Sequence, residues 1–67
     1  MTFSQRLKEL RNREQLTQQQ MSLRLNMDQS TYSRYENGNT VPVIDIVLRI
    51  VEEFGVSPDW LLGKDKK

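Results

Sequence analysis

The closeness of two short helical patterns between Gln18 and Gly38 constrains the fold of this chain more than any other feature. One pattern covers residues 17–25 and the second covers residues 29–36. Only three residues lie between them, namely Asn26, Met27 and Asp28. A connection of about three residues joins two helices at roughly 90 to 120°. We therefore expect a helical corner whose second helix projects its polar face from the surface.

The sequence before this corner also predicts helix. Phe3, Leu7 and Leu10 recur at the spacing of an apolar helical stripe, so a first helix is expected from about residue 3 to residue 13. Two capping-box patterns, each a threonine followed three residues later by a glutamine, mark the starts of this helix and of the next one. These patterns consist of Thr2 with Gln5 and of Thr17 with Gln20.

The third helix has its own start and stop signals. Asp28 is expected to accept hydrogen bonds from the free backbone N–H groups that open the helix over residues 29–36, and its charge suits the positive end of the helix dipole. Asn37 and Gly38 follow this helix, and both residue types tolerate the left-handed backbone that ends a helix.

Two further helices complete an all-α architecture. A fourth helix that is mainly core is predicted from an apolar stripe ending before Gly55, made of Ile44, Val47, Leu48, Val51 and Phe54. Ser57 and Pro58 are typical of the first positions of a short fifth helix that continues through Leu62. The sequence thus predicts a compact domain of five helices.

Length and composition exclude several classes of protein. The 67 residues suffice for one small domain, so residues 1–67 are expected to form a single unit in which residues 64–67 are a flexible tail. Cysteine and histidine are both absent, so we expect no disulfide, no catalytic residue, no metal site and no cofactor. No stretch approaches the roughly 18 apolar residues of a membrane helix, and no secretory signal is recognisable. A soluble, cytoplasmic protein is the expectation.

The charge of the chain is nearly balanced. The formal net charge is +1, which argues against a purely electrostatic binder of nucleic acid. Residues 1–40 carry six basic and four acidic residues, a net of +2, whereas residues 41–67 carry four basic and five acidic residues, a net of −1. This asymmetry weakly favours a basic surface formed by residues 1–40. Charges scattered over the solvated surface would explain it equally well.

The helix order and several local motifs together resemble the helix-turn-helix family of lambdoid phage repressors and Cro, also called the XRE family. The resemblance covers nearly the whole chain. Its motifs are Thr17-Gln18 at the start of the second helix, Tyr35 to Gly38 at the end of the third, a proline before the fourth helix, Phe54 to Ser57, and Leu61 to Gly63. It implies a five-helix domain resembling that of lambda repressor, which reads DNA.

Four residues depart from the pattern of that family. Ser22 stands where alanine is favoured and Asn26 where glycine is favoured, but both keep the property that matters, small size and tolerance of left-handed backbone. Tyr32 stands where the family favours a smaller aliphatic residue. If this tyrosine lies in the core, its hydroxyl needs a hydrogen-bond partner. The alternative is that Tyr32 contacts DNA or another protein. Val43 stands where a capping serine is common, which weakens the start of the fourth helix.

The outward face of the third helix supplies the candidate base readers. With Tyr32 and Tyr35 assigned inward, helical spacing places four polar residues on the opposite face: Gln29, Ser30, Ser33 and Arg34. Glutamine can pair with adenine, arginine with guanine, and serine with either, so Gln29 and Arg34 are the leading base readers. Without the surrounding motif, the same residues would read as ordinary solvated surface.

The resemblance implies further residues with assigned roles. It implies that Gln18 and Asn37 contact DNA phosphates. Thr17 is a further candidate, because it stands at the start of the second helix, where free backbone N–H groups favour a phosphate. Gln19 and Thr31 are less certain neighbours, and a solvated polar run is the alternative for residues 18–20. Thr40 is a further candidate phosphate contact, for which the alternative is an ordinary loop residue. In that family, an ion pair joins the residues at the two positions that Arg11 and Glu36 occupy here.

The fifth helix leaves two interpretations open. Trp60 is the only tryptophan and can cap the core, but the helix is also a candidate dimer surface that would include Val56, Trp60, Leu61 and Leu62. The leading hypothesis is a DNA-binding transcriptional regulator, most simply a repressor, that binds a palindromic double-stranded operator as a homodimer. The alternative is a protein-interaction module such as a small antitoxin or anti-repressor, and an enzyme is a distant third.

Overall fold

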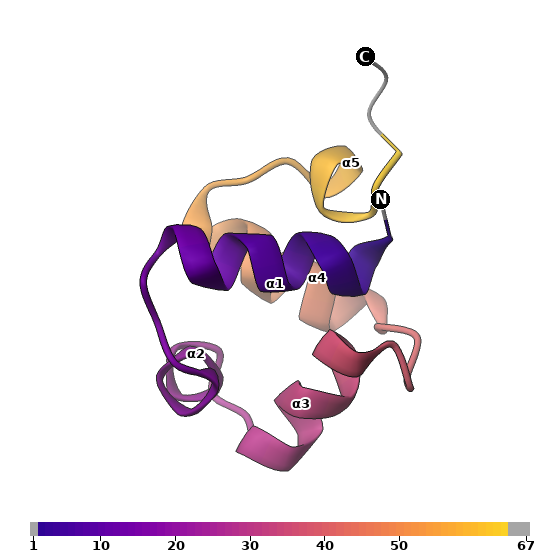
Figure 1. Cartoon of the computed structure of the whole chain (residues 1–67). Helices are drawn as coiled ribbons and strands as arrows, with labels where there is room; N and C mark the ends of the chain where they lie inside the picture. Colours follow the sequence, from indigo (N-terminus) through magenta and orange to yellow (C-terminus); the bar gives the residue numbers. More distant parts are fainter. Residues whose placement is uncertain (1, 65–67) are drawn as a thin grey trace.

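Five helices, in the expected order, make up the computed structural model, which describes residues 2–64 (Figure 1). They are α1 (Phe3–Arg13), α2 (Gln18–Arg24), α3 (Gln29–Asn37), α4 (Ile44–Phe54) and α5 (Pro58–Leu61). The expected tail therefore lies almost wholly outside the described residues. Within residues 2–64 there is no strand, so the prediction of an all-α fold is confirmed.

Local hydrogen bonds fix most helix starts where the sequence predicts them. The side chain of Thr2 accepts from the backbone of Gln5, and that of Thr17 accepts from the backbone of Gln20, with both reciprocal capping-box bonds present. Ser57 Oγ accepts from the backbone N–H of Trp60, 2.9 Å away, at the start of α5. Each cap satisfies N–H groups that a helix start would otherwise leave without a partner.

Two helix starts lack such a bond. Asp28 has the extended backbone of an N-cap residue, but its side chain makes no capping hydrogen bond, so the prediction that it accepts from the N–H groups of α3 was wrong. Only the charge of this carboxylate near the helix N-terminus remains favourable. Val43 also caps α4 without a side-chain bond, as expected for an aliphatic residue.

Left-handed residues end helices and shape the corner between α2 and α3. Gly38 and Gly55 end α3 and α4 with φ of 78° and 68°. Asn26 adopts φ of 58° within the connection formed by residues 25–28, which agrees with its expected tolerance of this conformation. Gln15 also has a positive φ, 59°, which the sequence did not indicate. Ser22 is buried beside the corner, and its hydroxyl donates to the Gln19 carbonyl at 2.7 Å.

The core lies where α1 crosses the other helices. In Figure 1, α1 runs across the middle, α5 lies above it, α4 lies behind it, and α2 and α3 lie below. Helix α3 packs against α1 and α2, and α5 packs against α1 and α4. The buried side chains are mainly aliphatic, with two tyrosines from α3: Leu7, Leu10, Met21, Leu25, Tyr32, Tyr35, Val47, Ile50 and Leu61.

Helix α4 departs from its predicted apolar stripe. Val47 and Ile50 are buried, whereas Ile44 and Leu48 are 67% and 45% exposed. The helix is rotated so that Val47 and Ile50 lie in the core, which leaves the Ile44 side of the stripe at the edge of the core. The prediction that this whole stripe is core was therefore wrong for two of its members.

Candidate nucleic-acid interface

Helix α3 divides into a buried face and an exposed face. Tyr32 is fully buried, and Glu36 is buried on the same side, one turn further along the helix. On the other side Gln29, Ser30 and Arg34 are exposed and Ser33 is half-buried. The structure thus brings the four predicted base readers together on one surface, and it places Tyr32 in the core rather than on that surface.

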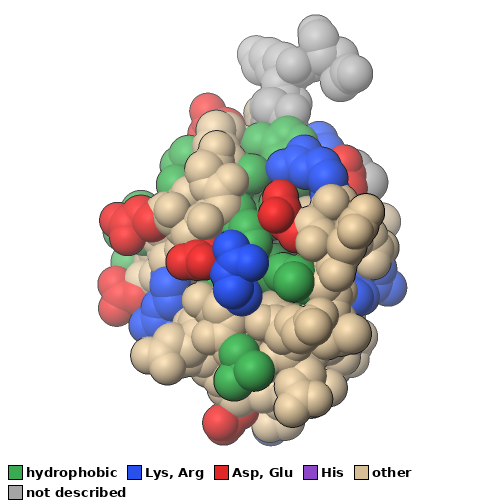
Figure 2. Space-filling view, turned by 90° about the vertical axis from the view of Figure 1, so that its left-hand side faces the viewer, with side chains coloured by type: hydrophobic (Ala, Val, Ile, Leu, Met, Phe, Trp, Pro, Cys, Tyr) green, Lys and Arg blue, Asp and Glu red, His purple; other side chains and the backbone are tan. Residues whose placement is uncertain are grey.

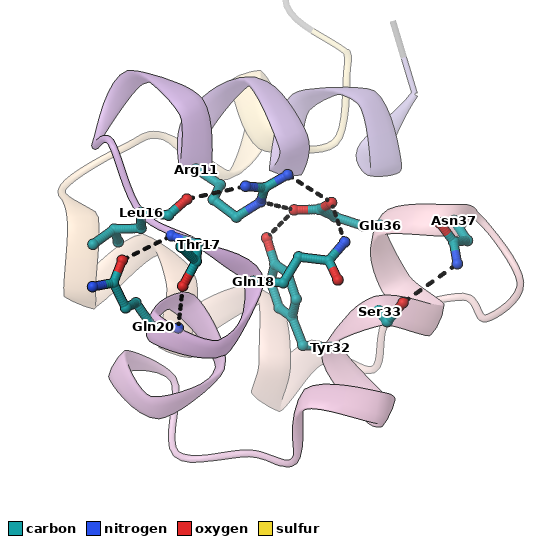
Figure 3. Close-up of polar contacts among 9 residues, drawn as sticks. All are labelled: Arg11, Leu16, Thr17, Gln18, Gln20, Tyr32, Ser33, Glu36 and Asn37. Carbon is teal, nitrogen blue, oxygen red and sulfur yellow. Dashed lines mark hydrogen bonds and ion pairs between the residues drawn. The ribbon is translucent and has the colours of Figure 1, made fainter.

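The buried face of α3 is held by one carboxylate. Arg11 of α1 donates from Nε to Glu36 Oε2 at 2.5 Å and from Nη2 to Oε1 at 3.3 Å (Figure 3). Gln18 Nε2, from the first residue of α2, donates to Oε1 at 3.0 Å. The Tyr32 hydroxyl donates to Oε2. Glu36 therefore accepts hydrogen bonds from three helices, and this network fixes how α3 sits against α1 and α2.

The surroundings of Glu36 keep it charged although it is buried. Burial alone would raise the pKa of this carboxyl, but hydrogen bonds from Arg11, Tyr32 and Gln18 outweigh it, so the pKa lies below its ordinary value. Burial, followed by the hydrogen bond to Glu36, raises the pKa of the Tyr32 hydroxyl, which stays protonated and keeps donating. The hydrogen bond to Glu36 likewise raises the pKa of Arg11.

The start of α2 lies beside the last turn of α3 because Gln18 reaches Glu36. Gln18 is half-buried, whereas Thr17 and Gln19 are exposed. The Thr17 hydroxyl oxygen accepts from the backbone of Gln20 at 3.1 Å, so its own proton stays available for another acceptor. The Gln18 amide uses one N–H on Glu36 and has a second N–H to offer.

The other predicted phosphate contacts lie at and beyond the end of α3. Asn37 is exposed, and its Nδ2 donates to Ser33 Oγ at 3.4 Å, which places the two side chains along one edge of α3 (Figure 3). Thr40 is exposed in the connection to α4, and Thr31 is half-buried in α3. Polar uncharged side chains and backbone, coloured tan, dominate the lower half of the side of the molecule on which α2 lies (Figure 2).

Two other features, a metal-binding group and a membrane-spanning helix, are absent from the described part of the chain. Residues 2–64 contain no group of three or more acidic residues placed to hold a metal ion. Among the same residues, none of the helices has the length and apolar character needed to cross a membrane.

Comparison with known proteins agrees with this geometry. The amino-acid sequence matches the family described as a helix-turn-helix domain over residues 4–65. The chain belongs to the helix-turn-helix domain family. This confirms the resemblance that Thr17-Gln18 and the Tyr35 to Gly38 motif carry.

Relatives of this helix-turn-helix domain are described as regulators. The chain is 36% identical over 66 residues to the HTH-type transcriptional regulator ImmR of Bacillus subtilis (strain 168), and the match covers 98% of this chain and 52% of ImmR. It is 37% identical over 60 residues to YqaE of the same organism, an uncharacterized HTH-type transcriptional regulator, covering 90% of this chain and 52% of YqaE. The chain therefore spans about half the length of the curated relatives that it matches.

A solved structure shares the same fold. A crystal structure of a transcriptional regulator from Listeria innocua matches the helix-turn-helix domain with a TM-score of 0.86 and 29% sequence identity. The match covers 98% of this chain and 62% of that chain. The five-helix arrangement is thus that of a solved regulator.

The structure changes one prediction for the fifth helix. Leu61 is fully buried in the core, so its assignment to a dimer surface was wrong. Trp60 is half-buried and packs under two guanidinium groups of α1, those of Arg6 and Arg13, whose Cζ atoms lie 4.7 and 5.2 Å from its ring centroid. The partly buried Val56 and Leu62 also pack against the core.

Sequence reasoning missed two features of the site. The bond from Gln18 to Glu36 joins residues 18 positions apart, and no local pattern indicates it. The bond from Tyr32 to Glu36 had a signal, because residues four apart lie on the same face of a helix. This signal would also have identified the partner that a buried Tyr32 hydroxyl needs.

Proposed function

We propose that this helix-turn-helix domain binds DNA sequence-specifically as part of a transcriptional regulator and inserts α3 in the major groove. The observation that carries the proposal is the division of α3 into two faces. Its buried face is fixed to α1 and α2 through Glu36, while its exposed face presents amide, hydroxyl and guanidinium groups. A rigid helix with such a face fits the major groove, where base edges present donors and acceptors.

The proposed contacts follow from where each side chain lies. Gln29 and Arg34 would pair with adenine and guanine, and Ser30 and Ser33 would contact neighbouring base edges. The second amide N–H of Gln18 and the hydroxyl proton of Thr17 would reach phosphate oxygens beside the groove. The remaining proposed phosphate contacts are Gln19, Thr31, Asn37 and Thr40.

Regulation would follow from the occupation of a promoter, most simply by repression in the cytoplasm. A single module of this kind buries only about 600 to 1,000 Å² on DNA. Two copies on a palindromic operator, with half-sites about 10 bp or 34 Å apart, would supply the missing affinity. The names of the relatives support regulation of transcription, and the direction of regulation is our proposal.

Selection of bound sequences from a random duplex pool, at a stated salt concentration, tests this function. We expect enrichment of a two-fold symmetric sequence with two half-sites about 10 bp apart. Pools that return no preferred sequence, with binding that does not depend on salt, would contradict DNA reading. That result would instead favour the protein-interaction module.

A further inference from the structure

A hydrogen bond joins two side chains near the end of α3. Asn37 Nδ2 donates to Ser33 Oγ over 3.4 Å, and the two residues lie one turn apart on the same side of the helix. Figure 3 shows this pair to the right of the hydrogen bonds around Glu36, with no bond drawn between the two groups. The bond therefore links a proposed base reader to a proposed phosphate contact.

The direction of this bond decides what the Ser33 hydroxyl can offer to a ligand. An amide N–H only donates, so Ser33 Oγ is the acceptor and keeps its own proton. A serine within a helix often donates that proton to a carbonyl of the preceding turn, as Ser22 does to Gln19 at 2.7 Å. Within residues 2–64, Ser33 Oγ donates to no acceptor. Its proton therefore remains for a ligand of α3.

We propose that Asn37 is a positioning residue that makes Ser33 a hydrogen-bond donor toward DNA, so that Ser33 selects a base with an acceptor and disfavours cytosine. This inference rests on the proposed function. In the major groove guanine presents O6 and N7, thymine presents O4 and adenine presents N7. Cytosine presents only its N4 amino group, which is a donor and cannot accept the Ser33 proton.

The two serines on the exposed face of α3 should therefore read DNA differently. The Ser30 hydroxyl is exposed and makes no hydrogen bond within residues 2–64, so it can rotate to donate or to accept. Ser33 is half-buried, and the N–H of Asn37 occupies one side of its oxygen. The Ser33 proton must point away from that N–H, because two donor hydrogens repel each other. Ser33 is thus the more selective of the two.

A phosphate contact by Asn37 would reinforce this orientation. The Asn37 amide carries two N–H groups, and the bond to Ser33 uses only one of them. A phosphate oxygen accepts hydrogen bonds, so it would favour the amide orientation that presents N–H groups over the flipped one. The same amide would then hold the Ser33 hydroxyl while its second N–H contacts the DNA backbone.

Reversing the polarity of the bond is the decisive experiment. Asn37→Asp puts a carboxylate of the same shape beside Ser33, and a carboxylate only accepts, so the Ser33 proton would turn toward it and leave lone pairs for the base. Ser33→Ala identifies the base position, because discrimination against cytosine should disappear there. At that position of the selected operator, cytosine should weaken wild-type binding about fivefold relative to the preferred base. With Asn37→Asp the preference should change to a base with an amino group, cytosine or adenine.

Two variants separate this effect from a general change in charge. Asn39→Asp is the matched control, because Asn39 is exposed just beyond α3 and its side chain makes no hydrogen bond within residues 2–64. It should weaken binding to all duplexes and leave the preference intact. In Ser33→Ala/Asn37→Asp the new preference should vanish. A cytosine preference that persists there would show that the carboxylate itself reads the base, which overturns the proposal.

The remaining outcomes distinguish this inference from the proposed function. If the wild type selects an operator but Asn37→Asp leaves every position unchanged, the positioning role is overturned and DNA reading stands. If the wild type selects no sequence, both fail. Should Asn37→Asp not fold, the neutral Asn37→Ala serves instead, since a Ser33 hydroxyl without its donor can also accept and should lose the discrimination against cytosine.

The hydrogen bond itself can be tested without DNA. In the NMR spectrum of the free protein, Ser33→Ala should shift the side-chain N–H signals of Asn37 and leave those of Asn39 in place. Signals of Asn37 that do not move would overturn the proposal at its first step.

Discussion

At the scale of single residues, the fold and the candidate site meet at Glu36. Its buried carboxylate accepts from Arg11, Gln18 and Tyr32, and so links α1, α2 and α3. The same residue lies on the inner side of the helix that carries the proposed base readers. Changes in this network should therefore lower stability directly. They should affect DNA binding indirectly, by shifting α3 and the Gln18 side chain.

Replacing Arg11 tests the network most strongly. Arg11→Ala leaves a carboxylate whose side chain is fully buried without its ion pair, and we expect a loss of about 3 kcal/mol in the free energy of unfolding. Arg24→Ala is the control, because the 2.7 Å pair of Arg24 with Glu53 is exposed on both sides and should contribute under about 1 kcal/mol. Urea unfolding of both variants measures the difference. A double-mutant cycle with Glu36→Gln that shows no coupling to Arg11 would contradict the account.

Tyr32 gives a smaller change at the same carboxylate. Tyr32→Phe keeps the buried ring but removes one hydrogen bond to a charged group, and should cost about 1.5 to 3 kcal/mol. Tyr35→Phe is the matched control, because the Tyr35 ring packs edge-on against Phe3 and its hydroxyl has no hydrogen bond within residues 2–64. Urea unfolding that shows equal losses for the two variants would remove the role assigned to the Tyr32 hydroxyl.

Arg34 tests base reading directly. It is exposed, so Arg34→Ala should leave stability unchanged within about 0.5 kcal/mol. We expect specific binding to weaken by roughly 1 to 3 kcal/mol and one base position of the selected sequence to become degenerate. Lys8→Ala, on an exposed position of α1, removes the same charge and should leave the preferred sequence intact. An unchanged preference after Arg34→Ala would show that Arg34 does not read a base.

At the scale of elements, caps decide where helices begin, and two of them differ in an informative way. Thr17 accepts a hydrogen bond at the start of α2, whereas the Asp28 side chain makes none at the start of α3. Thr17→Ala should therefore cost about 1 kcal/mol of unfolding free energy, and Asp28→Ala only about 0.5 kcal/mol from the lost dipole interaction. Thermal or urea unfolding without DNA checks this order, and the reverse order would contradict the observed caps.

The helix limits could be predicted from the sequence because they depend on neighbouring residues. Thr2 with Gln5, Thr17 with Gln20, and Gly55 each act within one turn of a helix. The rotation of α4 about its axis could not be predicted in this way, since it depends on how the rest of the fold, including α5, packs against it. Ile44 and Leu48 satisfy the helical spacing of a core stripe and are nevertheless exposed.

The candidate site was predictable to a similar extent. The outward face of α3 follows from helical spacing once Tyr32 and Tyr35 are assigned inward. The contact of Gln18 with Glu36 depends on the packing of α2 against α3, so the sequence gives no sign of it. Leu61 was misplaced because a four-residue helix is too short for its spacing to separate a core side from a surface side.

At the scale of the whole molecule, the network should give stability a pH dependence with two limits. The pKa of Glu36 is lowered in the folded state, so its stabilisation is complete above about pH 4.3, the ordinary value for glutamate, and is lost as the pH falls through the folded pKa. The pKa of Tyr32 is raised in the folded state, so stability declines as the pH rises above about 10.

NMR titration tests the acid limit at its source. The side-chain carboxyl carbon of Glu36 should titrate below about pH 4.3, the ordinary pKa of a glutamate. Tyr32→Phe should move the Glu36 titration upward, because it removes one of the hydrogen bonds that favour the charged form. A Glu36 carboxyl that titrates at or above this ordinary value would contradict the proposed stabilisation of its charge.

The central claim is that the whole domain presents α3 to read DNA sequence. The most direct measurement is the affinity for the selected operator and for a scrambled duplex of equal length and composition, at several fixed salt concentrations. We predict that the operator binds about 10³-fold more tightly or better, that both affinities fall with salt, and that Arg34→Ala reduces the ratio between them. Equal affinity for the two duplexes at every salt concentration would contradict the claim.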